Sequence, residues 1–309
     1  MKILFMGTPD FAVPSLQMLI DSPHEIVGVL TQPDKPRGRK QVLTAPPVKD
    51  LALAHGLPVH QPDTLRGGAI APLLEETRPD LIVVVAYGKL LPEYVLQFPR
   101  LGCVNVHGSL LPRWRGAAPI QWSVIAGDAE TGVTTMKMAK GLDTGNILLT
   151  ARTSIGARET AGELFDRLAP MGAALLKKTI DQLSEADWEG TPQDDSAACY
   201  ASMLDKALAV VDWSKSAHAI DCLIRGLNPW PVALTSIDGA GMKLYAAQPE
   251  SGAGIPGTVL EADEKRGLLV ACGTGALRII ELQMVGGKRM RAQDYLRGHT
   301  IPVGCILGI

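Results

Sequence analysis

The chain has 309 residues, of which 46% are hydrophobic and 20% charged, and its formal net charge is −2. That is enough apolar material for a buried core and enough length for two domains. A nearly neutral chain gives no overall signal for nucleic-acid binding, so a basic surface for such a partner must be local. The five cysteines are scattered and form no C-x-x-C pair. This disfavours a disulfide framework and a zinc site, and it indicates a reducing compartment.

Neither the start of the chain nor its most apolar segment is typical of a targeting or membrane sequence. The opening MKILFMGTPDF has an apolar run that is too short for a signal peptide. Residues 80–86 form the most apolar later run, far short of the roughly 20 residues that a spanning helix needs. We therefore expect a cytoplasmic protein with no membrane association and no obligate protein partner.

The first part of the chain alternates between apolar runs and segments of helical length. Residues 2–6, 25–30, 81–86 and 102–106 are continuously apolar, as is typical of strands buried on both faces. Segments such as 11–20 separate them and have helical length. The alternation predicts an α/β domain with a Rossmann-like, mostly parallel sheet.

The pattern changes in the second half. Thr160 and Glu163 form a capping box that opens a helix with apolar residues at 3/4 spacing. Few large apolar residues follow over 184–201, which predicts a linker. A short amphipathic helix near 220–227 then precedes apolar runs at 242–246, 257–260, 268–272 and 277–282, which predict a small antiparallel β-barrel. We expect an N-terminal domain over 1–187, a linker over 188–206 and a C-terminal domain over 207–309.

The strongest candidate site follows the strand predicted at 102–106. Asn105 and His107 are two residues apart, so both side chains point to one face of the sheet. Gly108 then breaks the strand, and the carboxyl ends of strands are where open α/β sheets bind ligands. A buried core histidine beside a turn-capping asparagine would give the same spacing, so the pattern alone leaves both readings open.

A second candidate is Asp143, which stands between two glycines in GLDTG (residues 141–145). The glycines permit a tight turn, and the aspartate is either an ordinary turn former or a placed acid. After the first strand the chain reads GTPD rather than G-x-G-x-x-G, and it carries no P-loop lysine motif. These absences from the sequence disfavour a nicotinamide enzyme and a nucleoside triphosphatase.

Two local basic segments stand out on this nearly neutral chain. Residues 32–49 carry five lysines and arginines against Asp34 alone and predict a long structureless loop. A second cluster comprises Lys288, Arg289, Arg291 and Arg297. Such segments suit a phosphate-bearing partner, although solvated charge runs would look the same.

Longer motifs identify a family. The run NVHGSLLPRWRGAAPIQ (residues 105–121), together with GLDTG, resembles the folate-dependent formyltransferase family. Four further segments, GTPDFA, TQPDKPRGR, VVVAYGKLLP and NPWP, resemble the members of that family that act on initiator methionyl-tRNA. The resemblance covers nearly the whole chain. It implies a catalytic Rossmann-like domain and a C-terminal domain resembling an OB fold that helps to hold tRNA.

The resemblance also implies roles for particular residues. The donor would be 10-formyltetrahydrofolate, the acceptor the α-amine of methionyl initiator tRNA, and no metal would be needed. The catalytic residues would be Asn105, His107 and Asp143. The folate-binding residues would be Ser109, Leu110, Leu111, Pro112, Tyr87 and Gly88, with a cis peptide bond at Leu111–Pro112. From the two basic segments we expect tRNA binding by Arg37, Arg39, Lys40, Lys288, Arg289 and Arg291, of which Arg39 matches a loop arginine of the family.

The implied chemistry divides among the three catalytic residues. Asn105 would donate to the tetrahedral oxyanion, helped by His107. His107 and Asp143 would move the proton from the attacking nitrogen to the departing folate nitrogen. Alternatives are a formyltransferase acting on glycinamide ribonucleotide or an amino-sugar nucleotide, a formyl-folate hydrolase, an RNA-binding module on an inactive enzyme fold, and a nicotinamide dehydrogenase. Only a tRNA acceptor would give a steep salt dependence, because it offers many phosphates.

Overall fold

A computed structural model describes residues 1–38, 41–185 and 188–308. The chain divides into two compact units, each assembled from segments that are far apart in sequence. The first comprises Met1–Pro119, Glu130–Ser154 and Phe165–Ala201, and the second comprises Ile120–Ala129, Ile155–Leu164 and Ser202–Ile309.

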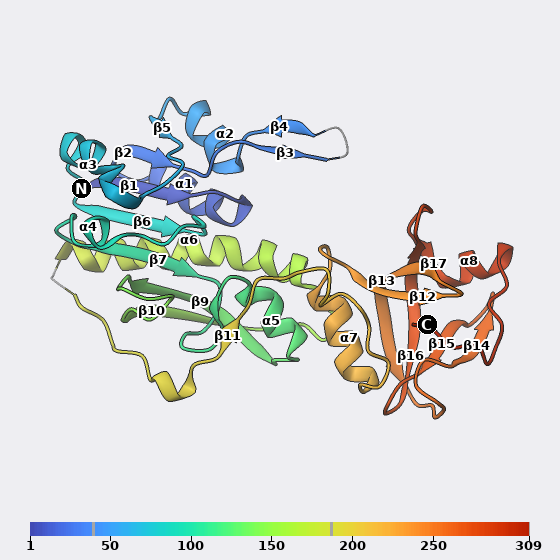
Figure 1. The fold of residues 1–309 in the computed structure, drawn as a ribbon. Helices are drawn as coiled ribbons and strands as arrows, with labels where there is room; N and C mark the ends of the chain where they lie inside the picture. Colours follow the sequence, from blue (N-terminus) through green and yellow to red (C-terminus); the bar gives the residue numbers. More distant parts are fainter. Residues whose placement is uncertain (39–40, 186–187, 309) are drawn as a thin grey trace. The chain divides into compact units, whose positions relative to one another are not determined.

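The first unit is built on a mostly parallel sheet. Within the described residues it has seven strands in the order β10-β9-β7-β6-β1-β2-β5 (Figure 1). The strands from β7 to β5 run parallel, whereas β9 is antiparallel to β7, and β10 is antiparallel to β9. Their bounds are β1 Lys2–Gly7, β2 Glu25–Leu30, β5 Val59–His60, β6 Leu81–Val85, β7 Cys103–His107, β9 Glu130–Lys137 and β10 Ile147–Ser154. The predicted Rossmann-like sheet is confirmed.

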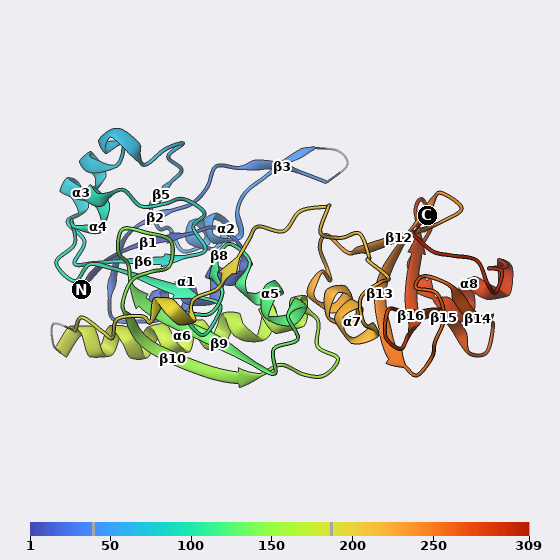
Figure 2. The same cartoon turned by 60° about the horizontal axis from the view of Figure 1, so that its bottom comes forward.

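The apolar runs form strands because both faces of this sheet are covered. On one face Leu4, Ile82 and Cys103 belong to a buried cluster with side chains from the helices after β5 and β6. On the other face the long helix α6 runs along the sheet (Figure 1 and Figure 2). There Thr179 of α6 and Thr135 of β9 share a buried hydrogen bond of 2.7 Å. Strands with two covered faces need no polar face, which explains their continuous hydrophobicity.

The capping box predicted for the long helix is present. The backbone N–H of Glu163 donates to Oγ1 of Thr160 over 3.2 Å, and the Glu163 carboxylate accepts from the Thr160 N–H over 2.8 Å. In the described part of the chain no helix is long and apolar enough to cross a membrane. The helices of residues 1–201 are η1 Asp10–Ala12, α1 Val13–Ile20, α2 Pro47–Ala54, η2 Arg66–Gly68, α3 Ala71–Thr77, α4 Glu93–Leu96, α5 Pro119–Ile125, α6 Ala161–Glu185 and η3 Asp195–Ala197.

The basic segment at 32–49 differs from the structureless loop that the sequence predicts. Lys35–Arg37 (β3) and Val42–Thr44 (β4) pair as an antiparallel hairpin, in the register Lys35 to Thr44 and Arg37 to Val42. The expectation was wrong because Pro and Gly were taken as breaking all regular structure, whereas a two-stranded hairpin tolerates both near its turn. A second small pair joins β8 (Arg115–Gly116) to β11 (Tyr200–Ala201), which run parallel.

The second unit is an antiparallel sheet with helices. Its strands follow the order β12-β13-β16-β15-β14, and β17 also pairs with β16. The predicted C-terminal antiparallel domain and the helix ending at Gly226 are confirmed, whereas the first strand, β12, was not predicted. Its elements are α7 Ala217–Gly226, β12 Ala233–Ile237, β13 Ala240–Glu250, β14 Val259–Asp263, β15 Gly267–Ala271, β16 Ala276–Met284, β17 Met290–Arg291 and α8 Ala292–Gly298.

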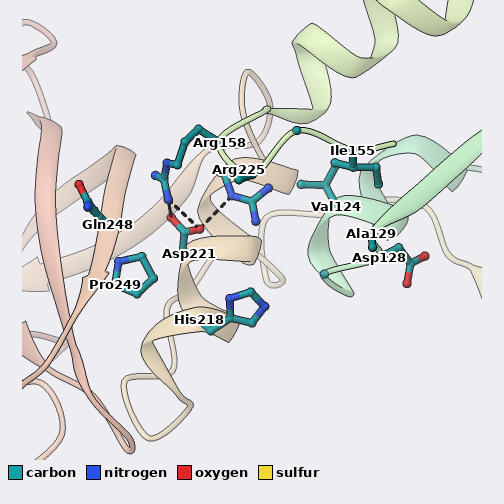
Figure 3. Close-up of a pocket in the computed structure, with 13 residues that line it drawn as sticks. Val124, Asp128, Ala129, Ile155, Arg158, His218, Asp221, Arg225, Gln248 and Pro249 are labelled. Carbon is teal, nitrogen blue, oxygen red and sulfur yellow. Dashed lines mark hydrogen bonds and ion pairs between the residues drawn. The ribbon is translucent and has the colours of Figure 1, made fainter. Parts of the chain in front are cut away.

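A buried aspartate of α7 holds two arginines inside this second unit (Figure 3). The Asp221 carboxylate accepts from Nε of Arg225 over 2.9 Å, and it lies 3.1 Å from Nη1 of Arg158. The Asp221 and Arg225 side chains are 3% and 8% exposed. All three residues line a pocket of about 440 Å³. Since the aspartate is almost wholly buried, these two cations compensate for the water it has lost.

Candidate active site

The two residues singled out in the NVH segment lie at the carboxyl edge of the sheet. Asn105 and His107 belong to β7, and Val84 of β6 pairs beside Asn105. Asn105 and His107 are nearly buried, with 9% and 6% of their surface exposed. Strand β7 is the neighbour of β6, and the strand order reverses direction one strand further on, between β6 and β1. Open α/β sheets bind ligands at the carboxyl ends of the strands near such a reversal, so the site is close to the expected position.

A backbone carbonyl orients the His107 ring. Nε2 of His107 lies 2.8 Å from the carbonyl oxygen of Trp114. A carbonyl can only accept, so Nε2 carries a proton and donates it. In the neutral ring Nδ1 is then the free base, and it lies 3.7 Å from Oδ2 of Asp143. The arrangement places the basic nitrogen next to a carboxylate that would stabilise its protonated form.

Asp143 reaches this position on the turn between β9 and β10. At Gly145 a β-carbon would lie 1.8 Å from the carbonyl oxygen of Lys137, so only glycine fits there. Asp143 itself is left-handed, with φ of 54°. Its carboxylate Oδ2 accepts from the backbone N–H of Gly116 over 2.8 Å. The side chains of Asp143 and His107 are 11% and 7% exposed, so the pair is largely shielded from water.

The segment after His107 is held by buried hydroxyls. Ser109 donates from Oγ to the carbonyl of Arg113 over 2.7 Å. Thr134 of β9 donates to the Ser109 carbonyl over 2.7 Å and accepts from the Leu111 N–H over 3.2 Å. Leu111 is buried, Leu110 and Pro112 are half-buried, and the predicted cis peptide bond at Leu111–Pro112 is present.

Tyr87 and Gly88 follow β6 at the same edge of the sheet. The Tyr87 carbonyl accepts from Oγ1 of Thr8 over 3.1 Å and from Nε2 of Gln32 over 3.0 Å. Burial raises the pKa of the Tyr87 phenol to about 12. Gly88 has φ of 83°, which leaves a bare backbone at this turn. Thr8 and Gln32, which the sequence analysis did not single out, thus fix the backbone at the predicted folate site.

The predicted tRNA-binding residues fall into two groups. Arg37 belongs to β3, while Arg39 and Lys40 lie outside the described residues. Lys288, Arg289 and Arg291 are exposed around β17 in the second unit. Arg289 is already engaged, because it pairs with Glu281 and stacks 4.4 Å from the ring centre of Tyr245. Its charge is therefore partly neutralised by a neighbour.

Several residues that hold the site were missed by sequence reasoning. Trp114 contributes a carbonyl, and Cys199 accepts at Sγ from the Trp114 N–H over 3.2 Å. Arg115 and Gln193 bind one another, and Gln193 also binds the Asp143 turn. No periodicity or motif marks Gln193, because it lies in a stretch poor in apolar residues. Among the residues that the structure describes, no group of three or more His, Cys, Asp or Glu side chains could hold a metal ion.

Comparisons with known proteins agree with this geometry. Residues 1–180 match the family model described as formyl transferase, and residues 203–300 match that of the formyl transferase C-terminal domain. The methionyl-tRNA formyltransferase of Trichlorobacter lovleyi is 50% identical over 99% of this chain and 96% of its own length. That of Alkaliphilus oremlandii is 51% identical over the full length of both.

A solved structure shares the fold at much lower identity. The N-formyltransferase from Helicobacter canadensis, in complex with folinic acid and dTDP-3-aminofucose, has a TM-score of 0.68 at 18% identity. The match covers 94% of this chain and all of that one. This chain belongs to the formyl transferase family, and the two relatives named above, which match it along its length, are methionyl-tRNA formyltransferases.

Proposed function

We propose that this chain transfers the formyl group of 10-formyltetrahydrofolate to the free amino group of methionyl initiator tRNA, giving N-formylmethionyl-tRNA for translation initiation. The observation that carries the proposal is the meeting of His107 and Asp143, with Nδ1 and Oδ2 at 3.7 Å, at the sheet edge that also carries Asn105. The full-length relatives at 50% and 51% identity support the choice of acceptor. Five free thiols fit the predicted cytoplasmic location.

Asn105 would stabilise the charge that develops on the formyl oxygen. Attack of an amine on a formyl carbon produces a tetrahedral oxyanion, which a placed amide N–H can bind. Asn105 lies on β7 at this edge of the sheet and is 9% exposed, so its amide can serve as that donor. Loss of one such donor costs about 2.7–4 kcal/mol of transition-state stabilisation. We assign Asn105 this role, with His107 beside it.

His107 and Asp143 would move the proton. A model α-amine has a pKa of about 7.7–8.0, and the ester lowers it, so the attacking amine is largely free base near neutral pH. Nδ1 of His107 is the free base of the neutral ring and would take the proton that the nitrogen loses on attack. The Asp143 carboxylate stabilises the resulting imidazolium. The same proton then passes to the folate nitrogen as its bond to the formyl carbon breaks.

The folate would lie against the backbone after β6 and the segment after β7. The turn at Tyr87 and Gly88 is held by hydrogen bonds to the Tyr87 carbonyl. The adjoining wall would be formed by Ser109, Leu110, Leu111 and Pro112. Both segments leave the sheet at neighbouring strands, so one ligand can contact both. The proposed folate position is supported by this shared edge and by the half-buried apolar side chains of Leu110 and Pro112.

The tRNA would be held by the β3–β4 hairpin segment and by the cations near β17. Replacing Arg39 by alanine should raise the KM for methionyl-tRNA, while the KM for 10-formyltetrahydrofolate stays within about twofold. If Arg39 contacts a phosphate, the slope of log(KM) against log[salt] should fall by about 1. Steady-state kinetics across a salt series measures both. An equal rise of the two KM values would mean that the hairpin supports the domain rather than the tRNA.

The proposed function is tested by a direct transfer assay. Purified protein is mixed with 10-formyltetrahydrofolate and methionyl initiator tRNA, and formylmethionine is measured after base hydrolysis of the ester. Uncharged tRNA and a dTDP-linked amino sugar serve as alternative acceptors. We expect product with charged tRNA only. Formate released without transfer would indicate a hydrolase, and a formylated sugar would indicate an amino-sugar formyltransferase.

A further inference from the structure

One side chain outside both matched family regions binds the turn that carries the catalytic aspartate. Residues 1–180 and 203–300 match the two family models, and Gln193 lies between them. Its Nε2 donates to the carbonyl of Asp143 over 2.8 Å and to the carbonyl of Gly145 over 2.7 Å. We infer that Gln193 is a positioning residue that holds the Asp143 carboxylate against His107. This inference rests on the proposed function.

The other end of the Gln193 amide is also engaged. Its Oε1 accepts from Nε of Arg115 over 3.0 Å and from Nη2 of Arg115 over 2.8 Å. The next residue, Gly116, donates its N–H to Oδ2 of Asp143. A closed ring of contacts therefore runs from the Asp143 carbonyl through Gln193, Arg115 and Gly116 to the Asp143 carboxylate. Only an amide supplies both the two donors and the acceptor that this ring uses.

The Asp143 turn needs such external contacts. Asp143 has φ of 54°, a left-handed conformation that is unfavourable for most residues with a side chain, although aspartate adopts it more readily than most. Conformations of this kind persist where the surrounding structure imposes them. The two hydrogen bonds from Gln193 bind the carbonyls on either side of Thr144 and so hold the turn in place. Without them the backbone can relax, and the carboxylate would leave its position 3.7 Å from Nδ1 of His107.

The residues that follow Gln193 hold the opposite side of the same site. Strand β11 pairs with β8, and a β-carbon at Gly116 would lie 2.6 Å from the Ala201 carbonyl, which shows how closely the two strands approach. The Cys199 carbonyl accepts from the Arg115 N–H over 2.9 Å. Cys199 Sγ accepts from the N–H of Trp114, whose carbonyl orients His107. The stretch from 193 to 201 thus contacts the supports of both His107 and Asp143.

The test compares Gln193→Glu with Gln193→Met. Glutamate keeps an acceptor for Arg115 but has no N–H donors for the two carbonyls of the Asp143 turn. Methionine has a side chain of similar length but supplies neither the donors nor that acceptor. We expect both variants to lower kcat at least tenfold and up to about 100-fold, because small misplacements of catalytic groups have effects of that size. The KM values for 10-formyltetrahydrofolate and methionyl-tRNA should stay within about twofold, and the midpoint of thermal unfolding should be unchanged.

A matched control and a double variant make the test specific. Glu189→Ala removes a 72% exposed carboxylate from the same stretch of chain, one that pairs with Lys137 and touches neither Asp143 nor Arg115. It should leave kcat unchanged. If Gln193 acts through Asp143, then Gln193→Glu should have no further effect in an Asp143→Ala background, measured under single-turnover conditions.

The outcomes separate this inference from the proposed function. No transfer by the unaltered protein would refute the proposed function. Transfer by the unaltered protein, with kcat of Gln193→Glu within twofold of it, would overturn the positioning role alone. A loss of thermal stability together with a rise in both KM values would also overturn it, because Gln193 would then support the fold in general.

Discussion

Replacing His107 by alanine is expected to lower kcat for formyl transfer by about 10²–10⁴-fold, the range typical of losing a general acid or base. The variant loses the base that faces Asp143, while the Asp143 carboxylate keeps its bond from the Gly116 N–H. Binding of methionyl-tRNA should be little changed, because no phosphate contact is removed. Single-turnover formation of formylmethionine, with tRNA affinity measured separately, gives both quantities.

His55 offers a matched control for that experiment. It is an exposed histidine that follows α2, and it lies outside the candidate site. His55→Ala should transfer the formyl group at the rate of the unaltered protein. Should His107→Ala retain more than about a tenth of kcat, general acid–base catalysis by this residue would be refuted. The buried histidine would then serve only to pack β7 against its neighbours.

Replacing Asp221 by alanine is expected to destabilise the second unit by about 3–5 kcal/mol, the usual cost of removing one partner from a buried ion pair. The Arg225 guanidinium is 8% exposed and would lose the carboxylate that accepts from its Nε. Arg158, at 49% exposure, can turn toward water and contributes less. Native-state hydrogen exchange of the α7 amides, together with denaturant unfolding followed by circular dichroism, measures the loss.

An exposed pair of the same unit provides the comparison. Arg297 and Asp294 interact over 2.9 Å with side chains 65% and 47% exposed. Arg297→Ala should change the unfolding free energy by no more than about 0.5 kcal/mol, as surface pairs usually do. Equal effects of Asp221→Ala and Arg297→Ala would show that the buried carboxylate is compensated by water or by rearrangement of the two arginines.

The local part of this fold could be predicted because local patterns report burial. The run LIVVV at β6 is buried at every position, and its continuous hydrophobicity indicates two covered faces. The start of α6 could be predicted because the contact between Thr160 and Glu163 joins residues only three apart. The hairpin of β3 and β4 was missed, since its pairing depends on a turn whose flanking residues have little hydrophobic alternation.

The sequence by itself determined that Asn105 and His107 share one face of a strand end, because the side-chain period of a strand is two. Its motifs also determined the family. Only the tertiary structure decided that Asp143 meets His107, that the Trp114 carbonyl selects the tautomer, and that Gln193 clasps the Asp143 turn. These contacts join residues on separate elements, and their distances depend on how the β9–β10 turn, β8 and β11 pack together, which no periodicity along the chain encodes.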